Sequence, residues 1–321
     1  MNLRTPLCDQ FGVEFPIFLA GMGGVSYAHV CAAVSEAGAY GTLGMASCTP
    51  EQIRDEMREV RERTKRPFGV DLLAALPDHM MECIDVIIEE GASSFIAGLG
   101  VPEQLIEKCH AGGVKVISMC GKVKHAVRAQ EAGCDVVVAQ GTEAGGHTGQ
   151  VAGMALIPQI VDAVDIPVLA AGSIVDGRGL AAALAFGAQG VWMGTRFIAS
   201  NEAHAAETYK KRIAEIREED TIVTRCYSGK PMRVIRNEYV EEWERRPEDI
   251  APFPLQALAS MEAGVFDALG PDLKDELDPN RAAMPCGQGA GSIHEILSCR
   301  QIIEQVMRQA RETVEGMAGL L

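Results

Sequence analysis

Apolar residues gather in eight short runs along the first two hundred residues of the chain. The runs begin at Pro16, Tyr40, Phe68, Ser94, Lys115, Val136, Pro167 and Gly190. Within each run the apolar residues are mostly consecutive rather than alternating, which is typical of strands buried on both faces of a parallel sheet. The pattern therefore predicts eight buried strands.

The segments between these runs have helical spacing. In residues 51–64, Ile53, Met57 and Val60 stand at positions i, i+4 and i+7 among charged residues, as in a helix with one buried face. We expect further helices over residues 79–91, 102–113, 123–133 and 178–188. A small residue and a glycine recur where the helices end, and Gly91 is an example of the left-handed cap that this allows.

Eight alternating strands and helices predict an α/β fold, a closed (β/α)8 TIM barrel. An open, doubly wound sheet is the alternative. The count of eight, and the lack of a G-x-G-x-x-G pattern after the first strand, favour the barrel. The active site of such a barrel lies at the carboxyl ends of its strands.

The alternation stops after Phe197. Residues 200–285 contain charged helical stretches and segments rich in proline and aspartate. We interpret them as a helical lid domain over the barrel mouth that sets the substrate, with Tyr227, Met232 and Trp243 as candidates for its pocket. The barrel domain would then comprise residues 1–199 and 286–321. A helix over residues 292–317 would complete its outer ring.

Composition narrows the class of protein. The net charge of −15 excludes an extended nucleic-acid-binding surface. The ten cysteines form no C-x-x-C pair, and no histidines or carboxylates show metal-ligand spacing, so we expect reduced thiols and no metal. No apolar run is long enough to span a membrane, and the first residues do not resemble a signal peptide. A cytoplasmic enzyme is the expected class.

Glycine pairs with hydroxyl residues follow the seventh and eighth runs. They are Gly172-Ser173 and Gly194-Thr195. Many barrels bind a phosphate in these two loops through backbone N–H groups, which glycine leaves accessible. The alternative is that the glycines only form tight turns. Their occurrence in both loops favours a phosphate site.

Residues 140–149, QGTEAGGHTG, follow the sixth run. Gln140 ends that strand, so the loop lies at the barrel mouth with His147 in it. An imidazole that titrates near neutral pH suits acid–base catalysis, although a histidine that only bonds the loop is the alternative. Gly145 and Gly146 leave room for a flat ligand, and Glu143 is a candidate anchor for the loop.

Two further glycine-rich segments adjoin the predicted mouth. Gly21, Met22 and Gly23 follow the first strand and offer a slot for a flat cofactor, although a methionine there also fits a core position. Gln288 lies in a late glycine-rich turn and could reach the mouth. That turn could equally be a simple junction with Ser292 as helix N-cap. From these residues alone we infer a barrel enzyme with a phosphorylated cofactor or substrate.

The sequence resembles the nitronate monooxygenase family, which also includes FMN-dependent enoyl-ACP reductases. The resemblance runs nearly end to end and is most specific in EAGGHTG and MGTRF. It implies an FMN-binding barrel with a helical lid, in which His147 is the base of nitronate oxidation. It also implies residues that line the flavin (Gly21, Met22, Gly23 and Gly145) and residues that hold its phosphate (Gly172, Ser173, Gly194 and Thr195).

Three positions depart from the family pattern, and the change at Ser173, where a glycine is usual, is mild. Asp71 stands where a neutral amide usually faces the flavin, and Met119 stands where some members carry a cation. Asp71 is expected either to tune the flavin or to be protonated or paired. Both Asp71 and Gln140 are counted among the predicted cofactor-binding residues.

The resulting hypothesis is an FMN-dependent oxidoreductase that oxidises a nitronate or related carbon acid, with O2 reoxidising the flavin. One alternative is an enzyme that uses NAD(P)H to reduce an enoyl thioester or quinone-like acceptor. A barrel that acts on a phosphorylated metabolite without redox chemistry, or that binds flavin without turnover, is another. We expect a small-molecule substrate, no nucleic-acid or membrane partner, and a homodimer as one arrangement of the chain.

Overall fold

Eight parallel strands form the centre of the molecule. The structure, a computed structural model, describes residues 3–46, 48–73, 77–98, 101–269 and 277–320. The strands are β1 (Ile17–Leu19), β2 (Gly41–Gly44), β3 (Phe68–Leu73), β4 (Ser94–Gly98), β5 (Lys115–Cys120), β6 (Val136–Gln140), β8 (Val168–Ala171) and β9 (Gly190–Met193). Their order is β1-β9-β8-β6-β5-β4-β3-β2, and a bridge between Phe18 and Tyr40 joins the two edges. The predicted (β/α)8 barrel is confirmed.

The strands carry consecutive apolar residues because both faces of the sheet are buried. All residues of β1, β2, β8 and β9 are buried. In β1, Phe18 belongs to the apolar cluster inside the barrel, whereas Ile17 and Leu19 belong to the cluster beneath the helices. Because successive side chains of a strand point to opposite faces, both clusters require an apolar residue at every position.

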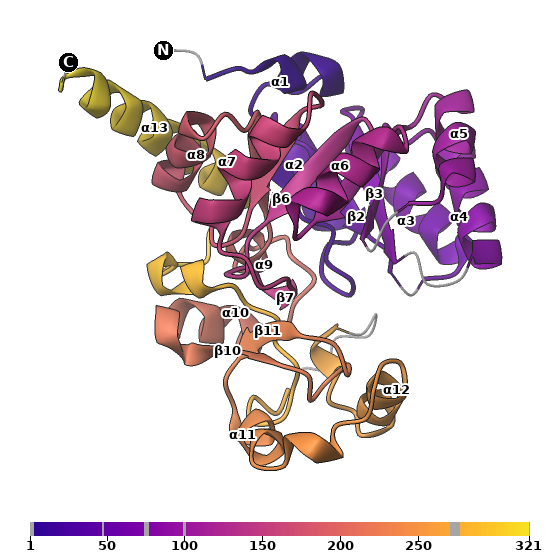
Figure 1. The fold of residues 1–321 in the computed structure, drawn as a ribbon, viewed down its shortest axis with the longest axis vertical. Coiled ribbons are helices and arrows are strands. Elements are labelled where there is room, and N and C mark those ends of the chain that lie inside the picture. The colour runs from indigo at the N-terminus through magenta and orange to yellow at the C-terminus, as the bar shows by residue number, and fades with distance from the viewer. Residues whose placement is uncertain (1–2, 47, 74–76, 99–100, 270–276, 321) are drawn as a thin grey trace.

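Helices surround the barrel (Figure 1). They are α2 (Ala28–Glu36), α3 (Pro50–Arg63), α4 (Pro77–Glu89), α5 (Glu103–Ala111), α6 (Val123–Glu131), α7 (Gly153–Ala163), α8 (Gly177–Ala185) and α13 (Cys299–Ala318). The predicted face of α3 is confirmed, because Ile53, Met57 and Val60 are buried. Among the residues described, no helix combines the length and apolar composition needed to cross a membrane.

A short N-terminal helix, α1 (Pro6–Phe11), closes one end of the barrel. Its Leu7, Cys8 and Phe11 join the apolar cluster inside the barrel. The ring of Phe11 packs edge-on against Phe18 and Tyr40, with ring centroids 5.3 and 5.0 Å apart. The open end is therefore the one formed by the carboxyl ends of the strands.

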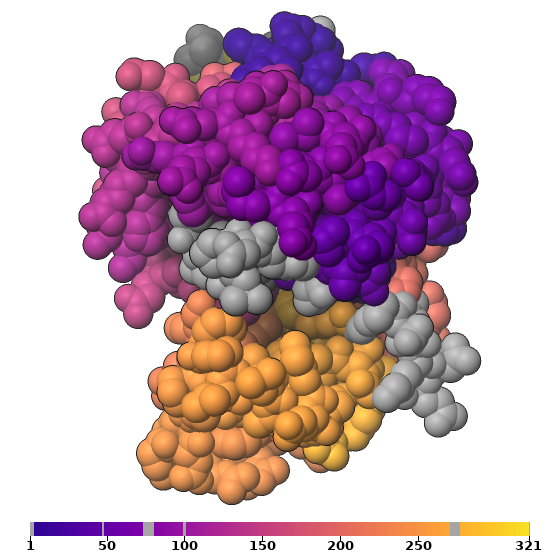
Figure 2. Space-filling view, turned by 90° about the vertical axis from the view of Figure 1, so that its right-hand side faces the viewer, coloured from indigo at the N-terminus to yellow at the C-terminus, as the bar shows by residue number. Residues whose placement is uncertain are grey.

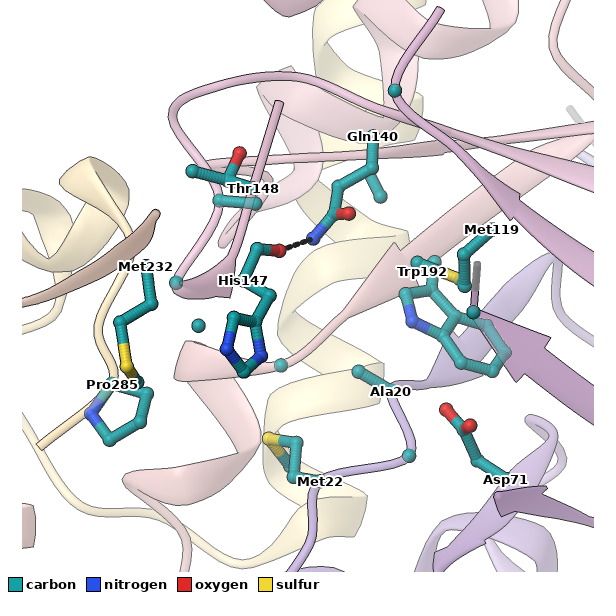
Figure 3. A pocket seen from close by; sticks show the side chains of 18 of the residues that line it. Ala20, Met22, Asp71, Met119, Gln140, His147, Thr148, Trp192, Met232 and Pro285 are labelled. Carbon is teal, nitrogen blue, oxygen red and sulfur yellow. Dashed lines mark hydrogen bonds between the residues drawn. The ribbon is translucent and has the colours of Figure 1, made fainter. Parts of the chain in front are cut away.

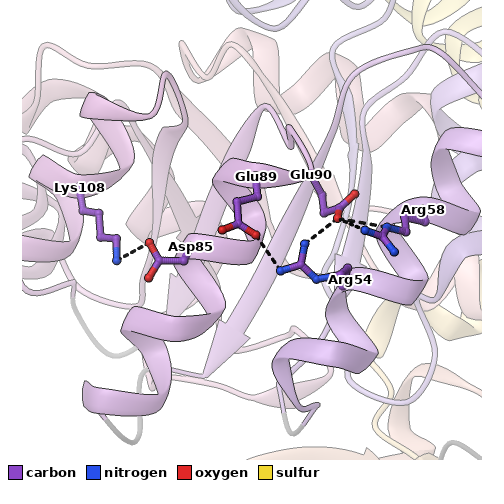
Figure 4. A network of polar contacts seen from close by, with 6 residues as sticks. All are labelled: Arg54, Arg58, Asp85, Glu89, Glu90 and Lys108. Atoms are coloured by element: carbon purple, nitrogen blue, oxygen red, sulfur yellow. Dashed lines mark hydrogen bonds and ion pairs between the residues drawn. The ribbon is translucent and has the colours of Figure 1, made fainter.

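Ion pairs connect three of the outer helices (Figure 4). Arg54 of α3 contacts Glu89 and Glu90 at the end of α4, at 2.7 Å each, and Arg58 also contacts Glu90 at 2.9 Å. Lys108 of α5 pairs with Asp85 of α4 at 2.6 Å. Hydrogen bonds from the two arginines lower the pKa of Glu90. Exposed pairs of this kind each contribute little to stability, but they neutralise the cations of this face.

The last helix begins later than predicted. Residues Gln288–Ser292 form a 3₁₀ turn, η4, and α13 begins only at Cys299. Ser298 is its N-cap and forms a capping box with Gln301, so the assignment of Ser292 as N-cap was wrong. The capping box supplies partners for first-turn N–H groups that the helix itself cannot satisfy, which fixes its start.

The sequence analysis predicted a helical insertion, but the insertion also contains strands. It contains α10 (Glu207–Glu215), α11 (Glu238–Glu244) and α12 (Leu255–Glu262), preceded by the short α9 (Thr195–Ile198). It also contains β10 (Thr221–Thr224) and β11 (Met232–Ile235), which pair antiparallel. A two-residue strand from the barrel, β7 (Gly146–His147), extends this sheet on the other side of β11. Strands of four residues among charged segments give little periodicity, so they were missed.

Candidate active site

A cavity of about 1150 Å³ lies at the carboxyl ends of the barrel strands. Its walls come from the barrel loops and from the insertion (Figure 3). In the view of Figure 2 the insertion, in orange, lies below the barrel. Every residue predicted to bind the cofactor lines this one cavity together with His147. These residues are Gly21, Met22, Gly23, Asp71, Gln140, Gly145, Gly172, Ser173, Gly194 and Thr195. Their convergence is observed, and their individual roles remain predictions.

Strand pairing with the insertion positions His147. As part of β7, His147 pairs with Met232 of β11, and Gly146 pairs with Arg233. The side-chain amide of Gln140 donates to the backbone oxygen of His147 at 3.2 Å (Figure 3). The strand that follows the barrel's sixth strand is therefore held from both the barrel and the insertion.

The imidazole of His147 has one side-chain partner among the residues described. Its Nε2 lies 2.9 Å from the hydroxyl oxygen of buried Ser228, which is also 3.2 Å from the carbonyl of Lys230. A serine hydroxyl has a single proton to donate. When Ser228 gives that proton to the Lys230 carbonyl, His147 Nε2 donates to Ser228 and Nδ1 is left as a proton acceptor.

The surroundings of His147 favour its neutral form. Burial lowers the pKa of the imidazole below its ordinary value, and the nearby charge of Lys230 lowers it further. The residue is nevertheless accessible, because it is exposed and lines the cavity. A neutral imidazole in this position is able to take a proton from a bound ligand at neutral pH.

The loops after β8 and β9 present free backbone donors to the cavity. Among the residues described, none accepts a hydrogen bond from the N–H groups of Ser173, Ile174 or Thr195. Ser173 has a φ of 54°, which is rare for a residue with a side chain, and Gly172 has a φ of 107°. Unusual backbone of this kind persists where the surroundings enforce it. The two loops thus fit the phosphate site that the sequence predicts.

The hydroxyl groups of these two loops also hold the late glycine-rich turn. Ser173 Oγ donates to the carbonyl of Glu143 at 3.1 Å and accepts from Gly289 N at 2.9 Å. Thr195 Oγ1 accepts from Gly287 N at 3.0 Å. Gly287 and Gly289 line the cavity, whereas the side chain of Gln288 is not part of its wall. The turn reaches the mouth through its glycines.

The loop of residues 141–149 is fixed by polar contacts. Both carboxylate oxygens of Glu143 accept from Gly153 N, the first residue of α7, at 3.0 Å, consistent with its expected role as an anchor. Buried Arg233 donates through two nitrogens to the carbonyl of Thr142 at 3.1 Å. A Cβ on Gly145 would lie 2.8 Å from backbone atoms of Cys286 and Gly287. Packing of the two loops therefore requires glycine there.

Asp71 is a carboxyl group that has no hydrogen-bond or ion-pair partner in the described part of the chain. It extends from β3 into the cavity near Ala20 and Trp192 (Figure 3), and no donor among the residues described bonds to it. Burial raises its pKa well above the ordinary value for aspartate. A Cβ on Gly21 would lie 2.1 Å from the Asp71 Cβ, so glycine is needed to accommodate the side chain. No partner for a paired carboxyl is present among the residues described, and burial favours the protonated form over the ionised one. An effect of Asp71 on the flavin stays a prediction.

The insertion contributes different residues from those predicted. Met232 lines the cavity, but Tyr227 and Trp243 do not. Tyr227 is buried in the core of the insertion, with its hydroxyl bonded to Asn237, and Trp243 packs near Tyr239. An aromatic residue in an insertion supports its own small core as readily as a pocket.

Sequence reasoning missed further residues of the cavity wall. They include Ser228, Lys230, Phe253 and Leu269 from the insertion, and Lys122, His125 and Arg128 from α6 and its N-cap. None of these positions carries a local motif. Only the cations at the start of α6, next to a predicted strand end, gave a signal.

Comparison with known proteins identifies the family. A family profile described as Nitronate monooxygenase matches residues 4–85 and 77–309. The chain belongs to the nitronate monooxygenase family. It is therefore an oxidoreductase of a flavin-dependent family, as the sequence predicts.

Three relatives show how far this similarity extends. A Mycobacterium tuberculosis protein named (3aS,4S,5R,7aS)-5-hydroxy-7a-methyl-1-oxo-octahydro-1H-indene-4-carboxyl-CoA dehydrogenase is 40% identical over 100% of both chains. A probable nitronate monooxygenase of Staphylococcus saprophyticus is 32% identical over 97% of this chain and 99% of its own. The structure of FabK from Thermotoga maritima is similar with a TM-score of 0.90 and 36% identity, over 99% of each chain.

Proposed function

We propose that this protein is an FMN-dependent oxidoreductase in which His147 removes a proton from a carbon acid, such as a nitronate or a compound activated by a neighbouring carbonyl. The observation that carries the proposal is the neutral, cavity-facing imidazole of His147, held by β11 and Ser228. It shares its cavity with the free backbone donors of the loops after β8 and β9.

FMN fits the residues present. Its phosphate would be held by the N–H groups of Ser173 and Thr195 and their neighbours, and its ring would lie along Gly21, Met22 and Gly23. When bound, FMN supplies a two-electron acceptor at the substrate carbon. The chain's own contribution is to orient the substrate and to hold its proton on His147. Lys230, close by, disfavours a second positive charge and so keeps the imidazole ready.

O2 is the proposed acceptor that regenerates the oxidised enzyme. The test is nitrite release from alkyl nitronates by the purified holoenzyme under air, for wild type and His147→Asn. We expect turnover by wild type and a loss of about 10²- to 10⁴-fold in the variant, the usual contribution of a general base. Turnover that is equal in both proteins would remove His147 from the reaction.

A second candidate is oxidoreduction at the carbon next to an acyl thioester. The cavity volume of about 1150 Å³ favours it, because drug-sized ligands occupy roughly 300–1,000 Å³ and a small nitronate needs far less. The full-length relative named as a carboxyl-CoA dehydrogenase points in the same direction. In this reaction His147 would take up or return the proton at that carbon.

Anaerobic mixing separates the candidates. Loss of flavin absorbance near about 450 nm, a general property of oxidised flavins, is followed after adding a nitronate, an acyl-CoA, NADH or NADPH. Bleaching by a nitronate or by a saturated acyl-CoA supports oxidation of that substrate. Bleaching only by NADH or NADPH supports a reductase. No bleaching by any of the four contradicts the proposal.

A further inference from the structure

One arm of the cavity runs along α6 and carries positive charge. Gly121, Lys122, His125 and Arg128 line it, followed by the small side chains of Ala129 and Ala132. Lys122 is the N-cap of α6, and His125 and Arg128 follow at intervals of three residues, so all three lie along one side of the helix. The arm is continuous with the part of the cavity that contains His147.

These cations have no ion-pair partner in the described part of the protein. Among the residues described, neither Lys122 nor Arg128 has a carboxylate within ion-pairing distance, and the same holds for Lys230 across the cavity. The contrast with α3, α4 and α5 is clear, because there the corresponding cations are paired (Figure 4). Lys122, His125 and Arg128 are thus three basic residues gathered on one wall of the cavity of a chain whose net charge is −15.

Lys122 and His125 do not serve the stability of α6, whereas Arg128 lies in its last turn, where a cation suits the helix dipole. Positive side chains near a helix N-terminus oppose the helix dipole, and α6 has no acidic residue in its first turn. Burial lowers the pKa of His125, and the charges of Lys124, Lys122 and Arg128 lower it further. Glu103, at the start of α5, is the carboxylate that lines the same arm, and it is exposed and without an ion pair among the described residues. The cluster therefore keeps a positive potential facing the cavity.

We propose that Lys122 and Arg128 bind the phosphate groups of an adenine-nucleotide tail whose reactive end extends to His147. The inference rests on the proposed function, and it names the class of ligand. Separate cations along two turns of a helix suit a ligand with several phosphates, and the apolar wall of Ala129 and Ala132 suits a flat base. Lys230 lines the same cavity and is a further cation for the diphosphate.

The site is distinct from the one proposed for the FMN phosphate. That phosphate is placed at the loops after β8 and β9, whereas α6 follows β5, and β6 lies between β5 and β8. Two ligands share the proposed chemistry, a coenzyme A thioester and NADPH, because each carries an adenosine diphosphate with a further phosphate on its ribose. The experiment must tell them apart.

The test measures dissociation constants of coenzyme A, NADPH and NADH for the holoenzyme by calorimetry, with pantetheine as a ligand without nucleotide. The double variant Lys122→Met/Arg128→Met is compared with Lys124→Met, which removes an exposed lysine of the same helix that does not line the cavity. We expect about ten-fold or greater weakening for at least one nucleotide in the double variant. Lys124→Met should change the dissociation constant of that nucleotide less than two-fold. The dissociation constant of pantetheine should be the same in all variants. Flavin content and circular dichroism verify folding.

Each outcome has a meaning. Weakening for coenzyme A alone assigns the site to a thioester substrate, and weakening for NADPH alone assigns it to a reductant. If no nucleotide binds wild type, or if the double variant binds all of them as wild type does, the site does not exist. An equal loss of affinity in Lys124→Met would mean that the effect comes from the overall charge of the protein, and this also overturns the proposal. Binding does not depend on turnover, so His147→Asn should still bind the nucleotide even if the proposed reaction is wrong.

Discussion

His147 is the residue whose chemistry the structure defines most closely. Its pKa is lowered by burial and by Lys230. A base acts in its deprotonated form, so activity rises with pH as the imidazole loses its proton. Because the pKa is lowered, the midpoint of that rise should lie below about pH 6.5, the ordinary value for histidine. The pH profile of kcat/KM measures it.

The charge on Lys230 gives a direct test of that assignment. Lys230→Met removes the charge that lowers the pKa of His147, so the acid limb of the profile should move to higher pH. Lys124→Met, distant from His147, should leave the limb in place. A limb that stays fixed in Lys230→Met would mean that His147 is not the titrating group.

Asp71 is predicted to destabilise the protein at neutral pH. Its pKa is raised in the folded state, so the folded protein favours the protonated carboxyl. The resulting stabilisation is complete below about pH 4, the pKa of an unfolded aspartate, and is lost as pH rises toward the raised pKa. Asp71→Asn has no charge to bury, so its Tm should exceed that of wild type at pH 8 by more than at pH 5.

Asp85→Asn is the matched control for Asp71. Asp85 is exposed and pairs with Lys108, and such pairs contribute little. Its substitution should change Tm only slightly at either pH. If Asp71→Asn lowers Tm at pH 8, the carboxylate is stabilised by something that the residues described do not provide.

At the scale of elements, the loop of β7 and the late glycine turn depend on each other. Gly145→Ala places a Cβ 2.8 Å from the backbone of Cys286 and Gly287. Overpacking of this kind typically costs about 1–3 kcal/mol, and here it would also displace the turn that Ser173 and Thr195 hold. We expect a lower Tm and weaker retention of flavin, measured by thermal unfolding and absorbance.

A second glycine shows whether that effect is specific. Gly316 lies in α13, where an added Cβ meets no atom within 4 Å. Gly316→Ala should stabilise the helix by about 0.5–1 kcal/mol, since alanine is the better helix former. If both substitutions behave alike, the contact of Gly145 with the late turn has no energetic importance.

Patterns in the sequence predicted the barrel better than the insertion, for a physical reason. Each barrel strand is buried on two faces, so its residues must be apolar and the signal is strong, as in Ile17, Phe18 and Leu19. In β11, Arg233 donates a hydrogen bond to the carbonyl of Thr142. No local pattern of residues encodes a contact of such long range. Tyr227 and Trp243 were assigned to the pocket because an aromatic residue gives no indication of which core it joins.

The residues of the site also divide into those that the sequence could place and those that it could not. The residues at strand ends, such as Asp71 and Gln140, could be placed because the fold brings all strand ends together. Ser228 and Lys230 could not, since only the pairing of β11 with β7 brings them to His147. The cation cluster of α6 could be recognised only from the lining of the cavity in the structure.

At the scale of the whole molecule, the phosphate of FMN should account for much of its binding. A ligand that binds only the folded state stabilises it by about 2.7 kcal/mol when present at a hundred times its Kd. Removal of FMN should therefore lower Tm, and adding FMN should restore it. Riboflavin, which lacks the phosphate, should restore much less at the same concentration. Equal recovery with riboflavin would contradict the phosphate site of Ser173 and Thr195.

The pairing of β7 with β11 also restricts how this enzyme can diversify. Side chains alternate along a strand, so a shift of one residue between Met232 and His147 would turn the imidazole to the opposite face of the small sheet. Under the proposed function, the insertion that would set substrate access is thus also the segment that orients His147 as the base. Grafting an insertion from a relative onto this barrel should preserve catalysis only where that register is kept. New specificity is then expected to arise by substitutions between β10 and α12 rather than by changes in length within β11.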